Sequence, residues 1–475
     1  MHKPGDVFDR DDEWAALDAF AGSATPSALL GVVSGRRRQG KSFLLQALVE
    51  QAGGAYVAAA ELSGREALRA VEAAVGATRG GPPVRLEGWP DALDALLGLS
   101  TERPLPVVID EFPYLVRAVP ELPSLLQAAL APRRRQRLDS RVRLVLCGSA
   151  VSFMGGLLSG SAPLRGRASL ELVVRPFDYR TAAQFWGLAD PALALRVHAV
   201  VGGTPAYRRE FVDGDAPRSL RGFDGWLVRR VLDPRSPLFR EARYLLAEEA
   251  DLRDVTGYHA LLAAVVAGRR TRTAIAGALG RTGPEISHQL TVLEDADLLV
   301  RREDALRARR PVYDVAEPLL AFYEAVMRPA WARLERGRGA EVWARSRETW
   351  QAQVLGPHLE SLAREWVAFH ASEETLGGVP DRVDAAVVAD PRSRSSHEVD
   401  IVAVSGDRIL ALGEVKLGER LGVRHVERLR RVRELLGPRA AGARLLLVGS
   451  GGFEAGVGHP SEVECVDLER LYAGG

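Results

Sequence analysis

Lysine is scarce in this chain of 475 residues, because only three of its 63 Lys and Arg residues are lysine. They are Lys3, Lys41 and Lys416. Arginine is a wide planar fork, whereas lysine is a compact and flexible point charge. Because almost every positively charged residue of this chain is arginine, lysine is expected at positions where a guanidinium cannot replace an ammonium group. We therefore expect Lys41 and Lys416, which lie in the motifs described below, to mark two chemical centres.

Cysteine and long apolar runs are scarce as well. The two cysteines, Cys147 and Cys465, lie far apart in the sequence and are expected to be reduced thiols. No apolar run approaches the roughly 18 residues that cross a bilayer. The N-terminal segment has no apolar stretch of the kind found in secretion signals. These absences predict a cytoplasmic protein with no membrane partner.

The charge balance excludes a polycation, since the net charge is only +1. A nucleic-acid surface would have to be a local patch, and the arginine clusters at 133–137 and 301–310 are the candidates. The alternative is that these clusters are ordinary solvated surface. The apolar fraction of 47% is typical of globular proteins, and the length predicts several domains.

Short aliphatic runs alternate with amphipathic stretches over the first 175 residues, which predicts a parallel sheet flanked by helices. Strands are expected at 29–34, 55–60, 106–110, 143–147 and 170–174. A helical region is expected at 176–255, with interruptions at Gly202-Gly203 and Pro234. A compact segment at 256–316 and a helical linker at 317–350 follow. A last α/β unit at 351–475 should have strands at 399–404, 409–415 and 444–449.

A glycine-rich loop at 35–42 matches the pattern G-x-x-x-x-G-K-[ST]. It follows an apolar strand and precedes an apolar helix expected at 43–50, which is the context that such a phosphate-binding loop requires. Its backbone N–H groups would surround phosphates at the positive end of the helix. Lys41 would reach the β- and γ-phosphates, and Ser42 would bind Mg²⁺. The expected nucleotide-contacting residues are Gly35, Arg38, Gln39, Gly40, Lys41, Ser42 and Phe43.

Polar residues also follow two other predicted strands. Asp110 and Glu111 follow the strand at 106–109, where Asp110 would bind Mg²⁺ and Glu111 would orient the attacking water. Ser149 follows the strand at 143–147 and is interpreted either as a sensor of the γ-phosphate or as a helix N-cap. Guanine specificity normally requires an N/T-K-x-D segment, which none of the three lysines supplies. ATP is therefore the expected nucleotide.

These motifs, taken in order, resemble the archaeal-type ATPases of the STAND branch of AAA+ proteins. The resemblance rests on Phe8-Asp9-Arg10 with Glu13, GRRRQGKS, VVIDEFPYL, LVLCGSAVSFM, APLRGRASL and Gly202-Gly203-Thr204-Pro205-Ala206-Tyr207. It implies an ATP-driven conformational switch. It also implies that Arg167, or alternatively Arg165, lies near the γ-phosphate, and that Pro205 of a lid domain contacts the nucleotide.

Residues 271–302 carry a helix–turn–helix pattern. A helix is expected at 272–279, a turn at Gly280 and a second helix at 283–295, with wing strands at 298–302 and 311–315. Ser287, His288 and Gln289 are candidates for the exposed face that enters a DNA groove. The alternative is a winged-helix packing module that never contacts DNA. Acidic neighbours weaken the positive character of this helix.

The third centre combines Asp400 with Glu414 and Lys416. Alternate side chains of a strand share a face, so Glu414 and Lys416 should point the same way, and a hairpin could bring Asp400 beside them. Two carboxylates on one face repel unless a cation lies between them, which predicts a Mg²⁺ site where Lys416 positions or deprotonates water. The alternative is an ordinary surface Glu/Lys pair.

This last pattern resembles the PD-(D/E)xK nuclease superfamily over roughly residues 350–450, in particular the nuclease-like domain often fused to these ATPases. The resemblance implies that Asp400, Glu414 and Lys416 are the core positions. It also implies that Glu360, in a helix expected at 351–370, is an additional metal ligand.

The sequence thus predicts an α/β protein with a P-loop NTPase parallel sheet, a helical lid, a winged helix and a restriction-endonuclease-like domain. The predicted boundaries are 1–175, 176–255, 256–316, 317–350 and 351–475. The expected activity is ATP hydrolysis that controls a Mg²⁺-dependent nuclease or DNA-binding domain. The alternative is a non-nucleolytic ATP-dependent regulator whose winged helix binds DNA or a protein partner. DNA is the expected partner, and the oligomeric state is left open.

Overall fold

The computed structural model describes residues 1–247, 254–307, 311–458 and 462–473. The chain divides into two compact units, Met1–Pro176 and Phe177–Gly475. The first boundary expected from the sequence, at 175, falls next to this division. The expected lid, winged helix, linker and C-terminal domain all lie in the second unit.

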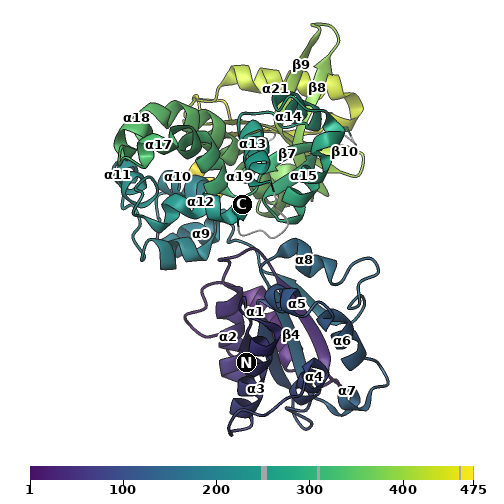
Figure 1. Ribbon diagram of the computed structural model, residues 1–475. Helices are drawn as coiled ribbons and strands as arrows, with labels where there is room; N and C mark the ends of the chain where they lie inside the picture. The colour runs from purple at the N-terminus through teal and green to yellow at the C-terminus, as the bar shows by residue number, and fades with distance from the viewer. Residues whose placement is uncertain (248–253, 308–310, 459–461, 474–475) are drawn as a thin grey trace. The chain divides into compact units, whose positions relative to one another are not determined.

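The first unit contains a five-stranded parallel sheet (Figure 1). Strands β3 and β4 are buried along their whole length, as expected for apolar strands that helices cover on both faces. The strand at the β5 edge alternates between more buried and exposed side chains. The strands are β1 Leu29–Ser34, β2 Ala55–Ala58, β3 Leu105–Asp110, β4 Val142–Gly148 and β5 Ala168–Val173.

Helices cover both faces of this sheet. Val33, Val108 and Val145 pack against α1 and α2 on one face, whereas Val32, Val107 and other strand residues pack against α3 to α6 on the opposite face. The helices are α1 Asp11–Ala21, α2 Lys41–Ala52, α3 Gly64–Thr78, α4 Trp89–Leu97, α5 Phe112–Ala118, α6 Leu122–Ala129, α7 Arg135–Asp139 and α8 Val151–Gly156.

The strand order β2-β3-β4-β1-β5 positions the first site. Because the strands are parallel, their carboxyl ends lie at one edge of the sheet. Strand β4 lies between β1, which leads into the glycine-rich loop, and β3, which ends at Asp110. Ser149, directly after β4, is therefore placed between the other two strand ends.

The second unit begins with a helical region, as expected. The break predicted at Gly202-Gly203 is present, and Gly202 has a φ of +59°. The break predicted at Pro234 separates α11 from α12. The elements are α9 Tyr179–Trp186, α10 Pro191–Val201, the π-helical η1 Tyr207–Phe211, α11 Leu220–Arg230 and α12 Pro237–Ala247.

The next segment has the predicted order of helices and strands. Gly280, with a φ of +65°, ends α14, and a reciprocal capping box between Thr282 and Glu285 starts α15. The antiparallel pair β6–β7 follows, and Thr271 adds a bridge to Val312. The elements are α13 Val255–Val266, α14 Arg272–Ala278, α15 Gly283–Asp295, β6 Leu299–Glu303 and β7 Pro311–Val315. Part of the predicted arginine cluster, residues 308–310, lies outside the described residues.

A helical stretch links this segment to the last sheet, as expected. Tryptophans 343 and 350 of α18 are buried there. The helix predicted at 351–370 begins with a π-helical turn before it becomes regular. The elements are α16 Pro318–Phe322, η2 Tyr323–Met327, η3 Arg328–Ala330, α17 Trp331–Leu334, α18 Gly339–Trp350, η4 Gln351–Leu355, α19 Gly356–Phe369 and α20 Glu373–Leu376.

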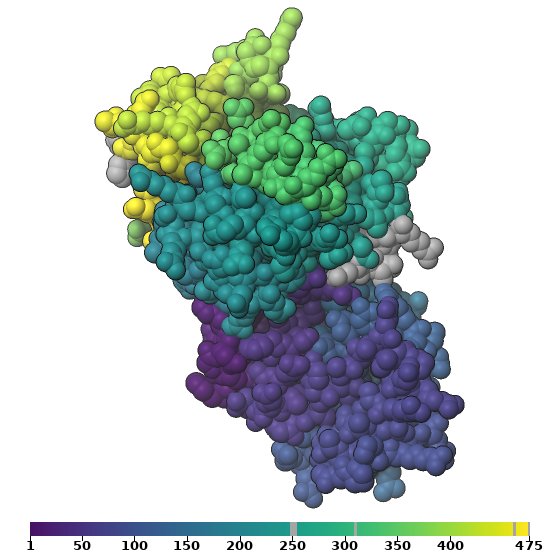
Figure 2. All heavy atoms as spheres, turned by 60° about the vertical axis from the view of Figure 1, so that its left-hand side comes forward, coloured from purple at the N-terminus to yellow at the C-terminus, as the bar shows by residue number. Residues whose placement is uncertain are grey.

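The C-terminal sheet is mixed, with the order β12-β11-β10-β9-β8. Strands β8, β9 and β10 are antiparallel, whereas β11 and β12 continue in parallel. The hairpin β8–β9 projects from the surface of this unit (Figure 2). The elements are β8 Arg382–Asp390, β9 Ser395–Ser405, β10 Arg408–Lys416, α21 Val423–Leu436, η5 Gly437–Ala440, β11 Arg444–Gly449, β12 Val463–Val466 and α22 Leu468–Ala473.

Two strands of this sheet, β8 and β12, were not expected, and the position predicted for Asp400 within its strand was wrong. Strand β8 carries three charged residues in nine and is only partly buried, and β12 has only four residues, so neither has the continuous apolar signature of a buried strand. Asp400 was expected at the start of a strand but lies in the middle of β9, because the preceding polar residues extend the hairpin.

The loop after β6 is built into the C-terminal sheet. The Ala305 N–H donates to the Ala385 carbonyl at 3.0 Å, and the Val387 N–H donates to Asp304 at 3.3 Å. The side chain of Ala305 is buried in the same apolar core as Val388 and Val402. The first residues of the loop of the predicted wing, 304–306, are therefore part of the C-terminal domain.

None of the helices among the described residues is long and apolar enough to cross a membrane. Both cysteines are free thiols, as expected.

Candidate functional site

The glycine-rich loop, residues 35–42, joins β1 to α2 and has the backbone that its glycines predict. Gly35 has a φ of +139°, and a Cβ at this position would lie 2.2 Å from the Val174 carbonyl oxygen, so only glycine fits. Gly40 (φ +86°) precedes α2 and offers no side chain to cap it. The first N–H groups of α2 are therefore directed at the loop, which is the arrangement that binds phosphate.

Lys41 is the first residue of α2 and is almost fully buried, with 5% of its surface exposed. Its ammonium donates to the carbonyl oxygens of Gly35 at 2.6 Å and Arg36 at 2.8 Å, so it lies across the loop. Burial lowers the pKa of Lys41, and the negative charges of Glu111 and Asp110 oppose that effect. The lysine is thus close to both acidic residues that follow β3.

Asp110 is surrounded by hydrogen-bond donors. The Tyr56 hydroxyl of β2 and the Glu111 N–H, at 2.9 Å, donate to its two oxygens. Burial acts to raise the pKa of Asp110, but hydrogen bonds from Cys147, Ser42 and Tyr56 outweigh it, and the pKa is lowered. The carboxylate is therefore ionised and in contact with the Ser42 hydroxyl. This pair of oxygen donors suits Mg²⁺, which prefers hard oxygen ligands.

Glu111 and Ser149 contact each other at the same edge of the sheet. Glu111 is in the left-handed region, with a φ of +51°, and precedes α5. Such a conformation is uncommon for a residue with a side chain and is concentrated at functional sites. The Ser149 hydroxyl donates to the Glu111 carboxylate at 3.1 and 3.3 Å. The residue that caps α8 is Ala150, so the N-cap interpretation of Ser149 is wrong.

Two further residues of this unit support the loop, and the sequence did not predict their roles. Arg10, in a left-handed conformation, donates to the Gln39 carbonyl at 3.2 Å and pairs with Glu13 at 2.8 Å. Arg37 donates to the Tyr114 hydroxyl at 2.6 Å. Both contacts join segments far apart in the sequence, which a single sequence does not reveal.

The remaining nucleotide residues are placed as follows. Arg167 donates to the Leu130 carbonyl at 3.2 Å, and Arg165 donates to the Gly160 carbonyl at 2.7 Å. Phe43 lies on α2 and is partly exposed. Pro205 lies in the second unit, just before η1. The expected contacts of Arg38, Arg167 and Pro205 with nucleotide stay predictions.

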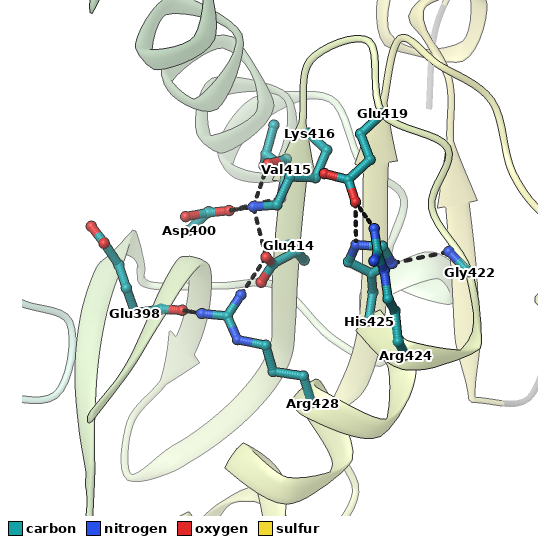
Figure 3. A network of polar contacts seen from close by, with 10 residues as sticks. All are labelled: Glu398, Asp400, Glu414, Val415, Lys416, Glu419, Gly422, Arg424, His425 and Arg428. Atoms are coloured by element: carbon teal, nitrogen blue, oxygen red, sulfur yellow. Dashed lines mark hydrogen bonds and ion pairs between the residues drawn. The ribbon is translucent and has the colours of Figure 1, made fainter. Parts of the chain in front are cut away.

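The second centre, formed by Asp400, Glu414 and Lys416, is assembled by the hairpin β9–β10 (Figure 3). The Asp400 carboxylate accepts the Val415 N–H at 2.8 Å. The Lys416 ammonium lies 2.7 Å from Glu414 Oε1 and 3.8 Å from Asp400 Oδ2. The three predicted side chains therefore meet on one face, and we call them the carboxylate–lysine centre.

Burial and a second cation set the electrostatics of this centre. The pKa of Asp400 is raised by burial and by the nearby Glu414 carboxylate. Burial acts to lower the pKa of Lys416, but the hydrogen bond with Glu414 and the charge of Asp400 outweigh it. Arg428 of α21, which the sequence did not single out, also donates to Glu414 Oε1. Two cations thus neutralise the two carboxylates.

Glu414 retains one oxygen for a ligand. The side chain is 1% exposed, and its Oε2 has no hydrogen-bond partner within the part of the chain that the structure describes. A buried carboxylate oxygen without a donor normally has an explanation such as a bound ion or water. The oxygens of Glu414 and Asp400 therefore fit a hard divalent cation.

Glu360 lies on α19 near the carboxylate–lysine centre. Burial and the charge of Asp400 raise the pKa of Glu360 to about 7. The Arg364 guanidinium, itself buried, lies 3.9 Å from the Glu360 carboxylate and donates to the Asp400 carbonyl at 3.1 Å. Among residues 1–247, 254–307, 311–458 and 462–473, no group of three or more His, Cys, Asp or Glu side chains is arranged to hold a metal. Glu360 as a third ligand stays a prediction.

The helix–turn–helix segment presents fewer free side chains than expected. The Ser287 hydroxyl donates to the Gly283 carbonyl at 3.0 Å, and Gln289 accepts from Arg281 at 2.9 Å. His288 is exposed. In the arginine cluster after α15, Arg301 pairs with Glu303 at 2.6 Å, and Arg302 pairs with Asp314 at 3.1 Å. The charges of Arg301 and Arg302 are therefore offset within the protein, whereas Arg309 and Arg310 lie outside the described residues.

No family model matches the chain. It is 24% identical over 333 residues to an uncharacterised protein of Methanocaldococcus jannaschii, an alignment that covers 69% of this chain and 70% of that protein. Among solved structures, a Walker-type ATPase of Pyrococcus abyssi is 20% identical, with a TM-score of 0.50, over 68% of this chain and 97% of that one. The ORC2 protein of Aeropyrum pernix is 16% identical, with a TM-score of 0.40, over 72% and 96%.

These comparisons concern the fold. The likeness to the Pyrococcus protein, the parallel sheet and the glycine-rich loop before α2 show that the chain has the fold of a P-loop ATPase. Archaeal Walker-type ATPases are thus the class of solved structure that it is similar to.

Proposed function

We propose that the chain binds and hydrolyses ATP with Mg²⁺ at the glycine-rich loop of the first unit. The observation that carries this proposal is the meeting of Lys41, Asp110, Glu111 and Ser149 at one edge of the sheet. Lys41 would exchange its loop carbonyls for the β- and γ-phosphates. Ser42 and Asp110 would hold Mg²⁺, which neutralises phosphate charge when bound. Glu111 would hold the attacking water in line with the γ-phosphate.

The test is nucleotide binding and turnover in the full chain. Lys41→Ala should weaken binding of a fluorescent ATP analogue by about 100-fold or more, because the charge facing the phosphates is lost. Lys416→Ala is the matched control, since it removes the other motif lysine and should leave ATP binding and hydrolysis within about twofold. Wild-type affinity in the Lys41→Ala protein would exclude this site.

We further propose that the nucleotide state controls a nucleic-acid-directed activity of the C-terminal domain. The convergence of Asp400, Glu414 and Lys416 supports Mg²⁺-dependent cleavage of a phosphodiester in DNA. A bound divalent cation there would polarise the phosphodiester and its attacking water. Lys416 would position that water, and Arg364 would hold the backbone that carries Asp400.

Digestion assays test the second activity. Plasmid, linear and single-stranded DNA should be incubated with Mg²⁺, with and without ATP. Cleavage should be present in the wild type and in Lys3→Ala, and absent in Lys416→Ala. If every form of DNA stays intact under all conditions, the nuclease part of the proposal fails while the ATPase part stands.

A non-nucleolytic regulator is the second candidate function. Its support is the internal neutralisation of Glu414 by Lys416 and Arg428, which gives the centre a stable arrangement without a metal. Under this alternative the C-terminal domain, or the winged helix predicted at 256–316, binds DNA or a protein without chemistry. Gel shifts that persist unchanged in Asp400→Ala, with no cleavage, would favour it.

A further inference from the structure

Arg428 occupies a specific place in the carboxylate–lysine centre (Figure 3). It extends from α21 and donates one N–H to Glu414 Oε1 and another to the Glu398 carbonyl at 2.6 Å. Its side chain is 35% exposed, whereas that of Glu414 is 1% exposed. Arg428 therefore lies between the buried carboxylate and solvent.

The charges of the centre balance without any bound ion. Asp400 and Glu414 contribute two negative charges, and Lys416 and Arg428 contribute two positive charges. The neighbouring Glu360–Arg364 pair adds one charge of each sign, and Glu398 is exposed to solvent. A divalent cation added to this arrangement would leave two excess positive charges in a mostly buried place. Charge that is buried without a counter-charge is strongly disfavoured. Cation binding therefore requires that one of the two side chains move away.

The two cations differ in their freedom to move. Lys416 is two residues from Glu414 on the same strand and lies against both carboxylates. Arg428 comes from a different element and reaches Glu414 with only the end of a longer side chain, whereas the exposed fractions of the two side chains are similar, 35% for Arg428 and 33% for Lys416. Its departure would expose Glu414 Oε1 beside the buried Oε2 that has no partner among the described residues. Arg428 is thus the side chain that can move away from Glu414 when a cation binds.

We propose that Arg428 is an internal counter-ion of Glu414 that a divalent cation displaces, and that the released guanidinium then binds the phosphodiester. This inference rests on the metal centre proposed above. Once Arg428 has moved, the cation and Lys416 face two carboxylates with one excess positive charge, which attracts the negatively charged phosphodiester. Guanidinium groups bind phosphate oxygens in a bidentate manner. Arg428 is therefore a positioning residue that couples metal binding to substrate binding.

The test compares metal affinity in the full-length protein. Mn²⁺ is titrated by electron paramagnetic resonance into nucleotide-free wild type, Arg428→Gln and Asp400→Asn, where the last variant defines the C-terminal site. We expect the Asp400-dependent site of Arg428→Gln to bind Mn²⁺ about tenfold more tightly than that of the wild type. Affinity for a 20-base-pair duplex in Ca²⁺ should fall about fivefold in the same variant, because a phosphate ligand is lost.

Arg431→Gln is the matched control on the same helix. Arg431 is 32% exposed and pairs with Asp390 at 3.1 Å, so its removal deletes a similar ion pair away from Glu414. Its Mn²⁺ affinity should stay within twofold of the wild type. If Arg428→Gln folds poorly by circular dichroism, Arg428→Lys retains the charge but loses the planar fork, and a two- to fourfold gain in Mn²⁺ affinity is expected.

The outcomes separate this inference from the proposed function. An Asp400-dependent Mn²⁺ site whose affinity is unchanged or weakened in Arg428→Gln would overturn the counter-ion role and leave the metal centre standing. Equal gains in Arg428→Gln and Arg431→Gln would also overturn it, since the effect would be general charge removal. Absence of any Asp400-dependent site would overturn both.

Discussion

The Ser149 hydroxyl donates to the carboxylate of Glu111, at 3.1 and 3.3 Å from its two oxygens. The bond joins the ends of β4 and β3, which are adjacent strands of the parallel sheet. It fixes the direction of a carboxylate whose backbone is already in the left-handed region. The proposed water-orienting residue and the proposed γ-phosphate sensor are thus one hydrogen-bonded unit, so a change in either should affect turnover more than binding.

Glu111→Gln tests that separation. The amide keeps the size of the side chain and can still accept from Ser149, but it cannot act as a base. ATP affinity should stay within about threefold of the wild type, and steady-state phosphate release should fall by about 100-fold or more. Phosphate release and equilibrium binding of a fluorescent analogue measure the two quantities. Parallel losses in both would mean that Glu111 holds the nucleotide rather than the water.

Gly35→Ala tests the shape of the glycine-rich loop. The added Cβ would lie 2.2 Å from the Val174 carbonyl at a φ of +139°, so the loop must move. We expect a loss of about 2–4 kcal/mol in the free energy of unfolding, with ATP affinity at least about tenfold weaker. Gly80→Ala is the control, because Gly80 also has a positive φ, of +73°, but has no atom within 4 Å of the added Cβ. It should cost about 1 kcal/mol and leave affinity unchanged.

Glu365 on α19 predicts a pH-dependent stability. Burial and the charge of Asp178 raise its pKa to about 7. Since that folded-state pKa is above the ordinary value of 4.5, the folded protein binds more protons than the unfolded chain between pH 4.5 and 7. The contribution of Glu365 to stability is therefore present at low pH and lost as the pH rises through 7.

Glu365→Gln should remove the loss of stability at high pH, because glutamine does not ionise. At pH 8 the variant should be more stable than the wild type by about 1–3 kcal/mol, and at pH 5 the difference should be small. Thermal unfolding at both pH values measures it. Glu348→Gln, at an exposed position of α18, is the control. A Glu365→Gln difference that is equal at pH 5 and pH 8 would contradict the raised pKa.

Ala305→Asp tests the junction between the predicted wing and the C-terminal sheet. A carboxylate at this position would be buried among apolar side chains, although the Arg382 guanidinium donates to the backbone carbonyl of the same residue. We expect a loss of about 2–4 kcal/mol in stability, with ATP affinity unchanged because the glycine-rich loop belongs to the other unit. Ala441→Asp, at an exposed position, is the control and should change stability by less than about 0.5 kcal/mol. Limited proteolysis with mass spectrometry would show whether the C-terminal sheet is the part destabilised.

The sequence predicted the residues at strand ends more reliably than those that support them. Asp110 and Ser149 were predicted together because parallel strands bring their carboxyl ends to one edge. Lys41 and Lys416 were singled out by the scarcity of lysine. These inferences needed only local pattern and composition. The structure brings together Lys41, Asp110, Glu111 and Ser149 in the first unit and Asp400, Glu414 and Lys416 in the second.

The missed residues depend on tertiary contacts. Tyr56 reaches Asp110 only because β2 pairs with β3, and Arg10 reaches Gln39 across 29 residues of sequence. Arg428 is one of several arginines on α21, and nothing in the sequence distinguishes it from Arg431. Strand β8 escaped prediction because charged and exposed positions interrupt its apolar residues, although Ala386 and Val388 are buried in the core. In an arginine-rich chain, the sequence alone does not show which residue each arginine contacts.

The burial of Ala305 has a practical consequence for dividing the molecule. A shortened chain that ends before residue 351 would keep the paired strands β6 and β7 but leave Ala305 and Leu306 in water, stripped of the sheet that covers them. Such a fragment should aggregate, because it exposes apolar side chains to water. The helix–turn–helix segment and the C-terminal sheet should therefore be expressed, purified or exchanged between proteins only as a single piece.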